Sequence, residues 1–204
     1  MERVIALIDG FNLYHSINSN QNLRKYKWLD LRKLSECFLK KSSESLSKVF
    51  YFSAYAFWNP EKENRHRVYV RALRSRGVEA VMSSFKVKMR KCRKCNRWYK
   101  TYEEKETDIR IVTTLFEYSI QNDYDTAVVV SGDTDLVPGL SFVKRIFPKK
   151  KIRSVFPFMR SSMSLKNMAD EFVRIKEKHL ASSQLPDVID LGEGKLLRRP
   201  DKWS

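Results

Sequence analysis

Two stretches of the chain place aspartates directly after apolar, strand-like runs. Residues 127–130 are apolar, and Asp133 and Asp135 follow them. Residues 4–8 are equally apolar and end at Asp9. In an open parallel sheet, ligands bind beyond the carboxyl ends of the strands, where the strand order reverses. If these two strands are neighbours, the sequence predicts an acidic site at that edge of the sheet.

Clustered carboxylates indicate a particular chemistry. Like charges held close together raise one another's pKa unless a cation lies between them. Oxygen ligands suit a hard ion, Mg²⁺ or Mn²⁺, better than zinc. Such an ion can activate water and stabilise the charge that develops on a phosphodiester during in-line attack.

A purely structural interpretation of each aspartate stays open. Asp108, which opens a helix expected from 108 to about 121, and Asp135 are both placed to be helix N-caps. The Asp-Gly and Gly-Asp pairs at 9–10 and 132–133 also suit simple turns. For one residue alone the structural interpretation is favoured, but two aspartates after two buried strands favour a shared site.

The composition limits the classes of function. The 204 residues include 40 Lys and Arg against 24 Asp and Glu, a net charge of +16, which favours nucleic acid as a partner and an anionic membrane second. No apolar run approaches the ~18 residues of a membrane span. The apolar run near the N-terminus is too short for a signal peptide, and three cysteines form no even framework. We therefore expect a cytoplasmic protein with no membrane partner.

The periodicity of apolar residues predicts the elements. Strands are expected near 3–8, 49–55, 78–82, 127–131 and 152–156, with helices between them. This alternation predicts a three-layer α/β domain with a mostly parallel central sheet of about five strands. A last amphipathic helix is expected after Ser164, with Leu165, Met168, Phe172 and Ile175 inward. From 181 to 204, Pro, Gly and charged residues predict a C-terminal tail.

A basic hairpin is expected as an insertion at about 85–103. Its basic residues, with one just beyond, are Lys86, Lys88, Arg90, Lys91, Arg93, Lys94, Arg97, Lys100 and Lys105. These can neutralise phosphates while Trp98, Tyr99 and Tyr102 stack on unpaired bases, which favours single-stranded RNA. The alternative, a solvated hairpin whose aromatic side chains fold into the core, is equally open.

The same hairpin contains Cys92-x-x-Cys95. A structural zinc site generally needs four ligands, and the chain offers only Cys37 and three histidines besides. A half-site completed by a second copy in a homodimer is one interpretation. A reduced thiol pair at a hairpin turn is the other.

At this point several motifs resemble those of one family. Residues 8–14 (Ile-Asp-Gly-Phe-Asn-Leu-Tyr) resemble the opening motif of NYN domains, the LabA-like branch of the PIN-like nuclease superfamily. Residues 105–108 resemble the family's K-x-x-D helix start, and 130–136 resemble its SGDxDF motif, with leucine for the usual aromatic residue. Residues 169–172 resemble its closing helix. Together the matches span residues 3–176.

The resemblance implies a Rossmann-like PIN fold, over residues 1–180, with an acidic, divalent-metal pocket of the kind associated with RNA cleavage. The residues implied are the carboxylates Asp9, Asp108, Asp133 and Asp135 as Mg²⁺ or Mn²⁺ ligands, Asn12 to orient a phosphate or a water, and Ser131 or Thr134 as supporting hydrogen-bond partners. We predict a metal-dependent endoribonuclease. The alternatives are a non-catalytic RNA-binding or regulatory module and, less compatible with the charge, an enzyme acting on a small molecule.

Overall fold

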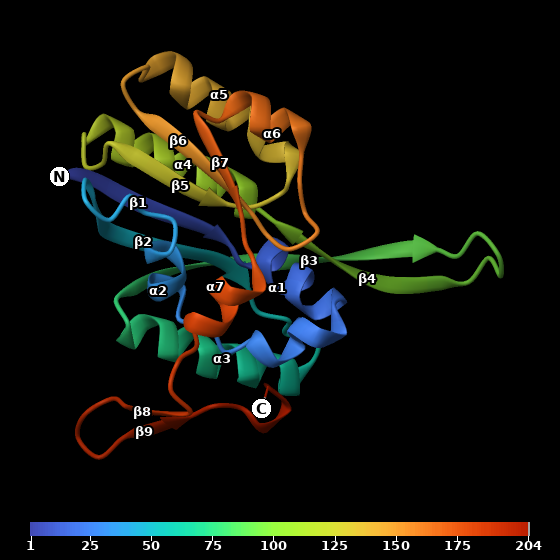
Figure 1. Cartoon of the computed structure of the whole chain (residues 1–204). Helices are drawn as coiled ribbons and strands as arrows, with labels where there is room; N and C mark the ends of the chain where they lie inside the picture. The colour runs from blue at the N-terminus through green and yellow to red at the C-terminus, as the bar shows by residue number, and fades with distance from the viewer. Residues whose placement is uncertain (204) are drawn as a thin grey trace.

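A seven-stranded sheet forms the middle layer of the fold (Figure 1), which a computed structural model describes for residues 1–203. In chain order the strands are β1 (Glu2–Asp9), β2 (Glu44–Ala54), β3 (Val78–Lys91), β4 (Trp98–Lys105), β5 (Thr126–Val130), β6 (Lys151–Phe156) and β7 (Glu171–Arg174). Their order in the sheet is β4-β3-β2-β1-β5-β6-β7, and all neighbours are parallel except β3 and β4. The predicted α/β class is confirmed. All five predicted strands are present, and β4 and β7 extend the sheet.

Helices cover both faces of the sheet (Figure 1). One face carries α1 (Gly10–Ser19), α2 (Leu31–Glu36), α3 (Pro60–Ser75) and α7 (Glu177–Ser182), and the other carries α4 (Thr107–Ile120), α5 (Val137–Ile146) and α6 (Met163–Met168). Alternate residues of β1 enter two separate cores, Ile8 among them on the first face and Leu7 on the second. Both faces are buried, which is why the strand reads as a continuous apolar run. Within residues 1–203, no helix is both long and apolar enough to cross a bilayer.

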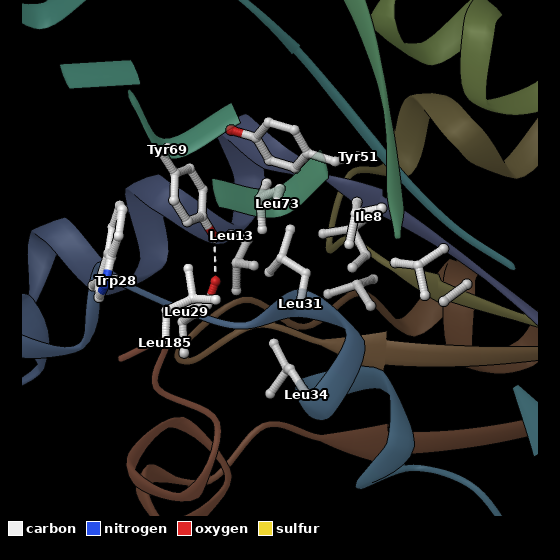
Figure 2. Close-up of a cluster of buried hydrophobic side chains, with 14 of the residues drawn as sticks. Ile8, Leu13, Trp28, Leu29, Leu31, Leu34, Tyr51, Tyr69, Leu73 and Leu185 are labelled. Carbon is white, nitrogen blue, oxygen red and sulfur yellow. Dashed lines mark hydrogen bonds between the residues drawn. The ribbon is translucent and has the colours of Figure 1, made fainter. Parts of the chain in front are cut away.

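The segment expected to be a tail packs against the first of these cores. It contains a small hairpin of β8 (Val188–Asp190) and β9 (Leu196–Arg198) and a 3-10 turn, η3 (Asp201–Trp203). The Trp203 ring lies 6.2 Å from Trp28 and 5.5 Å from Tyr69, measured between ring centroids. Tyr69 in turn donates a hydrogen bond of 3.0 Å to the carbonyl of Leu29 (Figure 2). The apolar residues that make these contacts are few and widely spaced, so the composition of the segment resembles that of a tail.

The long closing helix that was predicted is wrong. Ser162, not Ser164, caps α6, and α6 ends at Met168 because Ala169 is extended. The chain then enters β7, which pairs with β6 at the edge of the sheet. Phe172, expected to face inward on a helix, is 53% exposed on this edge strand.

β3 and β4 continue beyond the body of the protein as a two-stranded ribbon (Figure 1). The ribbon comprises residues 84–105, and its antiparallel pairs run from Ser84 with Lys105 to Lys91 with Trp98. The predicted hairpin insertion is therefore present. Its root lies beside α1, because the Phe85 ring packs edge-on against Phe11 with 5.4 Å between centroids.

Candidate functional site

Three of the four predicted carboxylates meet at the carboxyl edge of the sheet. One oxygen from each of Asp9, Asp108 and Asp133 lies within 4.8 Å of the others. Asp9 ends β1, and Asp133 follows β5, which pairs directly with β1. Asp108 comes from the first turn of α4. The strand order reverses between these two central strands, so the cluster lies where open α/β sheets bind their ligands.

Asp9 is held by two hydrogen bonds. Its Oδ1 accepts from the backbone N–H of Asn12 at 3.0 Å, which caps α1, and its Oδ2 accepts from the Ser131 hydroxyl at 2.8 Å. The glycine after Asp9 is required by packing. A Cβ at Gly10 would lie 2.5 Å from the Tyr51 ring. This glycine lets the start of α1 approach β2 closely.

The loop after β5 is fixed by the residues that the resemblance placed around the site. The Asn12 side-chain oxygen accepts from the Gly132 N–H at 3.0 Å, so Asn12 positions the loop. Ser131 Oγ accepts from the Asp133 N–H at 3.1 Å, and Asp133 Oδ1 accepts from the Asp135 N–H at 3.1 Å. Asp135 itself is exposed and lies outside the three-carboxylate cluster.

The electrostatics of the cluster favour a bound cation. Burial raises the pKa of Asp9, although both of its hydrogen bonds oppose this. Burial, followed by the charges of Asp133 and Asp9, raises the pKa of Asp108 to about 6. Asp108 does not cap its helix, because it lies inside the first turn of α4 and the N-cap residue is Glu106. An all-oxygen donor set whose charges repel one another fits a hard divalent cation. Within residues 1–203, this is the one group of three or more acidic, His or Cys side chains arranged to hold an ion.

Sequence reasoning missed three titratable residues that line the same cleft, which has a volume of about 220 Å³: His15, Glu104 and Arg160. Glu104 lies on β4 and accepts from the Thr107 N–H at 3.2 Å, which positions the start of α4. Arg160 follows β6 and is brought close by Gly132, where a Cβ would lie 2.9 Å from the Arg160 Cβ. The rule that predicted Asp133 applies equally after β6, so the sequence held a signal for Arg160.

Some aromatic side chains of the ribbon are exposed, as base stacking requires, and one folds back against the body of the protein. Trp98 and Tyr99 are exposed, 64% and 49% respectively. Tyr102 instead stacks on Trp58, with 3.9 Å between centroids, near the root. Glu103 forms ion pairs with both Lys88 and Lys105. The other predicted basic residues form no ion pair within residues 1–203: Lys86, Arg90, Lys91, Arg93, Lys94, Arg97 and Lys100.

The two cysteines of the CxxC motif lie at the tip of the ribbon. Hydrogen bonds from the backbone of Cys95 and Lys94 lower the pKa of the Cys92 thiol. Asn96, the next residue, adopts a left-handed conformation with φ of 57°. Cys37 is far along the chain and lies 3.7 Å from the Ser183 hydroxyl. One copy therefore supplies two thiols at the tip, and zinc shared between two copies stays a prediction.

Comparisons with known proteins show similarity to a named relative and to a solved structure. The chain is 26% identical over 242 residues to 6-hydroxy-3-succinoylpyridine 3-monooxygenase HspA of Pseudomonas putida, covering 98% of this chain and 75% of that protein. A protein of unknown function from Vibrio parahaemolyticus, VPA0982, has the same fold with a TM-score of 0.58 at 20% identity, covering 86% of this chain and 93% of that one. The family model described as NYN domain matches residues 3–176, which contain all three clustered carboxylates. The chain thus belongs to the NYN domain family.

Proposed function

We propose that this protein is a metal-dependent ribonuclease that cleaves single-stranded RNA at the carboxylate cluster. One observation carries the proposal. Asp9, Asp108 and Asp133 converge at the edge of the sheet from which the basic ribbon extends. These three carboxylates would hold Mg²⁺ or Mn²⁺. When bound, such an ion supplies water activation and neutralises charge on a phosphodiester.

The protein's own residues prepare the site before substrate arrives. Asn12 and Ser131 hold the two loops that carry Asp9 and Asp133, so the carboxylates are preorganised. Arg160 at the rim of the cleft provides a positive charge for a phosphate of the strand. The ribbon contributes unpaired cations and two exposed aromatic rings, the combination that binds unpaired nucleotides. Family membership supports this assignment, because acidic pockets in better-understood NYN domains are associated with RNA cleavage.

The test is cleavage of end-labelled single-stranded RNA in Mg²⁺, Mn²⁺ or EDTA. Asp133→Asn removes one charge but keeps the oxygen that accepts from the Asp135 N–H. Asp123→Asn is the matched control, because Asp123 is exposed just before β5, at the other end of that strand. We expect product with metal from wild type and from the control, none in EDTA and none from Asp133→Asn, with RNA binding retained throughout.

Two results would refute the ribonuclease. Undiminished cleavage by Asp133→Asn would exclude the carboxylate cluster as the active site. Salt-dependent RNA binding without product in any metal would instead indicate a non-catalytic RNA-binding module.

A second candidate is an enzyme that acts on a small aromatic acid. One observation favours it: the relative that aligns with 98% of this chain is named for a succinoylpyridine substrate. This candidate predicts saturable binding of 6-hydroxy-3-succinoylpyridine and no affinity for RNA. A thermal-shift titration with each ligand separates the two candidates, because only a bound ligand raises Tm.

A further inference from the structure

A second hollow lies next to the carboxylate cleft, and neither the family nor the ribbon accounts for it. It is a cavity of about 140 Å³ between α1, α3 and the end of β2. Phe11 lines both the cavity and the carboxylate cleft, and Gly10, the residue after Asp9, also lines the cavity. The two hollows therefore share a wall.

Aromatic rings form much of the wall of the cavity. Its rings belong to Phe11, Tyr14, Tyr51, His66, Tyr69 and Trp203. The Tyr51 hydroxyl lies 2.9 Å from His66 Nε2, and burial lowers the pKa of His66 to about 4, so the imidazole is neutral at pH 7. The Tyr51 and Tyr69 rings lie next to each other, with 5.9 Å between their centroids (Figure 2). Such a surface accepts the faces of a planar ring.

Three cations line the same cavity: Lys27, Lys62 and Arg65. Arg65 lies 3.5 Å from Glu61, whereas Lys27 and Lys62 form no ion pair within residues 1–203. Burial lowers the pKa of Lys27, and the neighbouring charges of Arg24 and Arg65 lower it further. The cavity thus combines an apolar interior with an excess of positive charge, which complements an anionic group.

Size restricts the ring. An apolar cavity of roughly 150 Å³ is sufficient for benzene, and this cavity of about 140 Å³ matches one six-membered ring. Because the cavity is open to solvent on one side, this volume favours a single ring over a bicyclic purine without enclosing it. We propose that the cavity binds a single six-membered aromatic ring carrying an anionic group, and that in the ribonuclease this ring is a pyrimidine base of the RNA strand. The second part rests on the proposed function. A small aromatic acid shares the same chemistry.

The test measures binding of CMP, UMP, AMP, cytidine and nicotinate to the full chain in EDTA, by ligand-observed NMR and calorimetry. We expect CMP and UMP to bind, with AMP and the uncharged cytidine at least about tenfold weaker. Lys62→Glu should weaken CMP binding about threefold to tenfold, the range for reversal of one exposed charge. Ala56→Leu, which adds bulk to the lining, should abolish it. Lys149→Glu is the matched charge reversal, on an exposed lysine outside the cavity.

Each alternative outcome is informative. AMP binding as tight as CMP binding, or CMP binding unaffected by Lys62→Glu and Ala56→Leu, would overturn the proposal. Nicotinate binding without CMP or UMP binding would overturn the nucleotide assignment and favour the small-molecule candidate. Because no turnover is measured, a protein that binds CMP but never cleaves RNA refutes the ribonuclease alone. A protein that cleaves RNA but does not bind CMP refutes the cavity proposal alone.

Discussion

Replacing Asp108 by asparagine should stabilise the metal-free protein, although it removes a residue of the proposed active site. The pKa of Asp108 is raised from 3.8 to about 6 by burial and by Asp133 and Asp9. At about 1.36 kcal/mol per pKa unit, this shift corresponds to roughly 3 kcal/mol. Since Asp108 is partly exposed, screening reduces the expected gain for Asp108→Asn to about 1–2 kcal/mol at pH 7.5.

The size of this effect depends on pH. A carboxylate whose folded pKa lies above its unfolded pKa contributes stability below the unfolded value, and that contribution is lost as pH rises through the folded value. For Asp108 the window runs from 3.8 to about 6. The advantage of Asp108→Asn should therefore be complete above pH 6 and absent below pH 4.

The assay is urea unfolding of wild type and Asp108→Asn in EDTA and in Mn²⁺, at pH 7.5 and pH 4. In EDTA at pH 7.5 the variant should have the higher free energy of unfolding. In Mn²⁺ the order should reverse, because an ion at 100 times its Kd stabilises wild type by about 2.7 kcal/mol. Asp125→Asn is the opposite control: Arg3 lowers the pKa of Asp125, so this change should destabilise the protein. The reasoning would be refuted if Asp108→Asn were less stable than wild type in EDTA, or if Mn²⁺ left the free energy of unfolding of wild type unchanged.

Two further predictions concern titratable groups that are partly or fully buried. His66 has its pKa lowered from 6.5 to about 4 by burial, with Tyr51, Tyr55 and Arg67 around it. The contribution of His66 to the free energy of unfolding should therefore fall by about 3 kcal/mol as pH drops from 6.5 to 4. His66→Gln should remove this part of the pH dependence in urea unfolding, and an unchanged pH profile would contradict the prediction. Glu44 accepts two hydrogen bonds from the buried Arg153 guanidinium, at 2.7 and 2.8 Å. Glu44→Gln should lower the free energy of unfolding by ~3 kcal/mol, the low end for breaking a buried pair, because Glu171 still pairs with Arg153. A loss below about 1 kcal/mol in urea unfolding would show that the pair is dispensable.

The sequence predicted the parts of the fold that local pattern specifies. β1 and β5 are buried on both faces, so their apolar runs mark them as central strands, and the aspartates that follow them meet because the two strands pair. The helix predicted through Ile175 failed because its apolar spacing is also compatible with a short edge strand. Ile175 donates its N–H to the Phe156 carbonyl of β6, a partner distant in sequence. Local periodicity contains no information about such a partner.

The roles within the site could be predicted less well than its members. Asn12 suits a phosphate contact by residue type, yet its side-chain oxygen is used by the Gly132 N–H. Asp135 looked equivalent to Asp133, but the 3-10 turn η2 (Thr134–Leu136) that begins after Asp133 leaves Asp135 exposed. The role of Asn12 depends on a hydrogen bond to a residue more than 100 positions away. The exposure of Asp135 depends on the type of turn that follows Asp133.

The positions of the carboxylates do not reveal whether the substrate is RNA or a small molecule. Asp9 caps α1 and accepts from Ser131, so its carboxylate would keep its place in any protein that retains these two contacts. The features that distinguish substrates lie outside this frame. The ribbon suits a polyanion, whereas the aromatic cavity between α1 and α3 suits a single ring with a negative charge. Removing the ribbon by joining residues 84 and 105 should therefore abolish RNA binding and leave binding of a small ring intact. If the shortened protein binds neither RNA nor the small ring, then the ribbon is also required for the structure of the cavity.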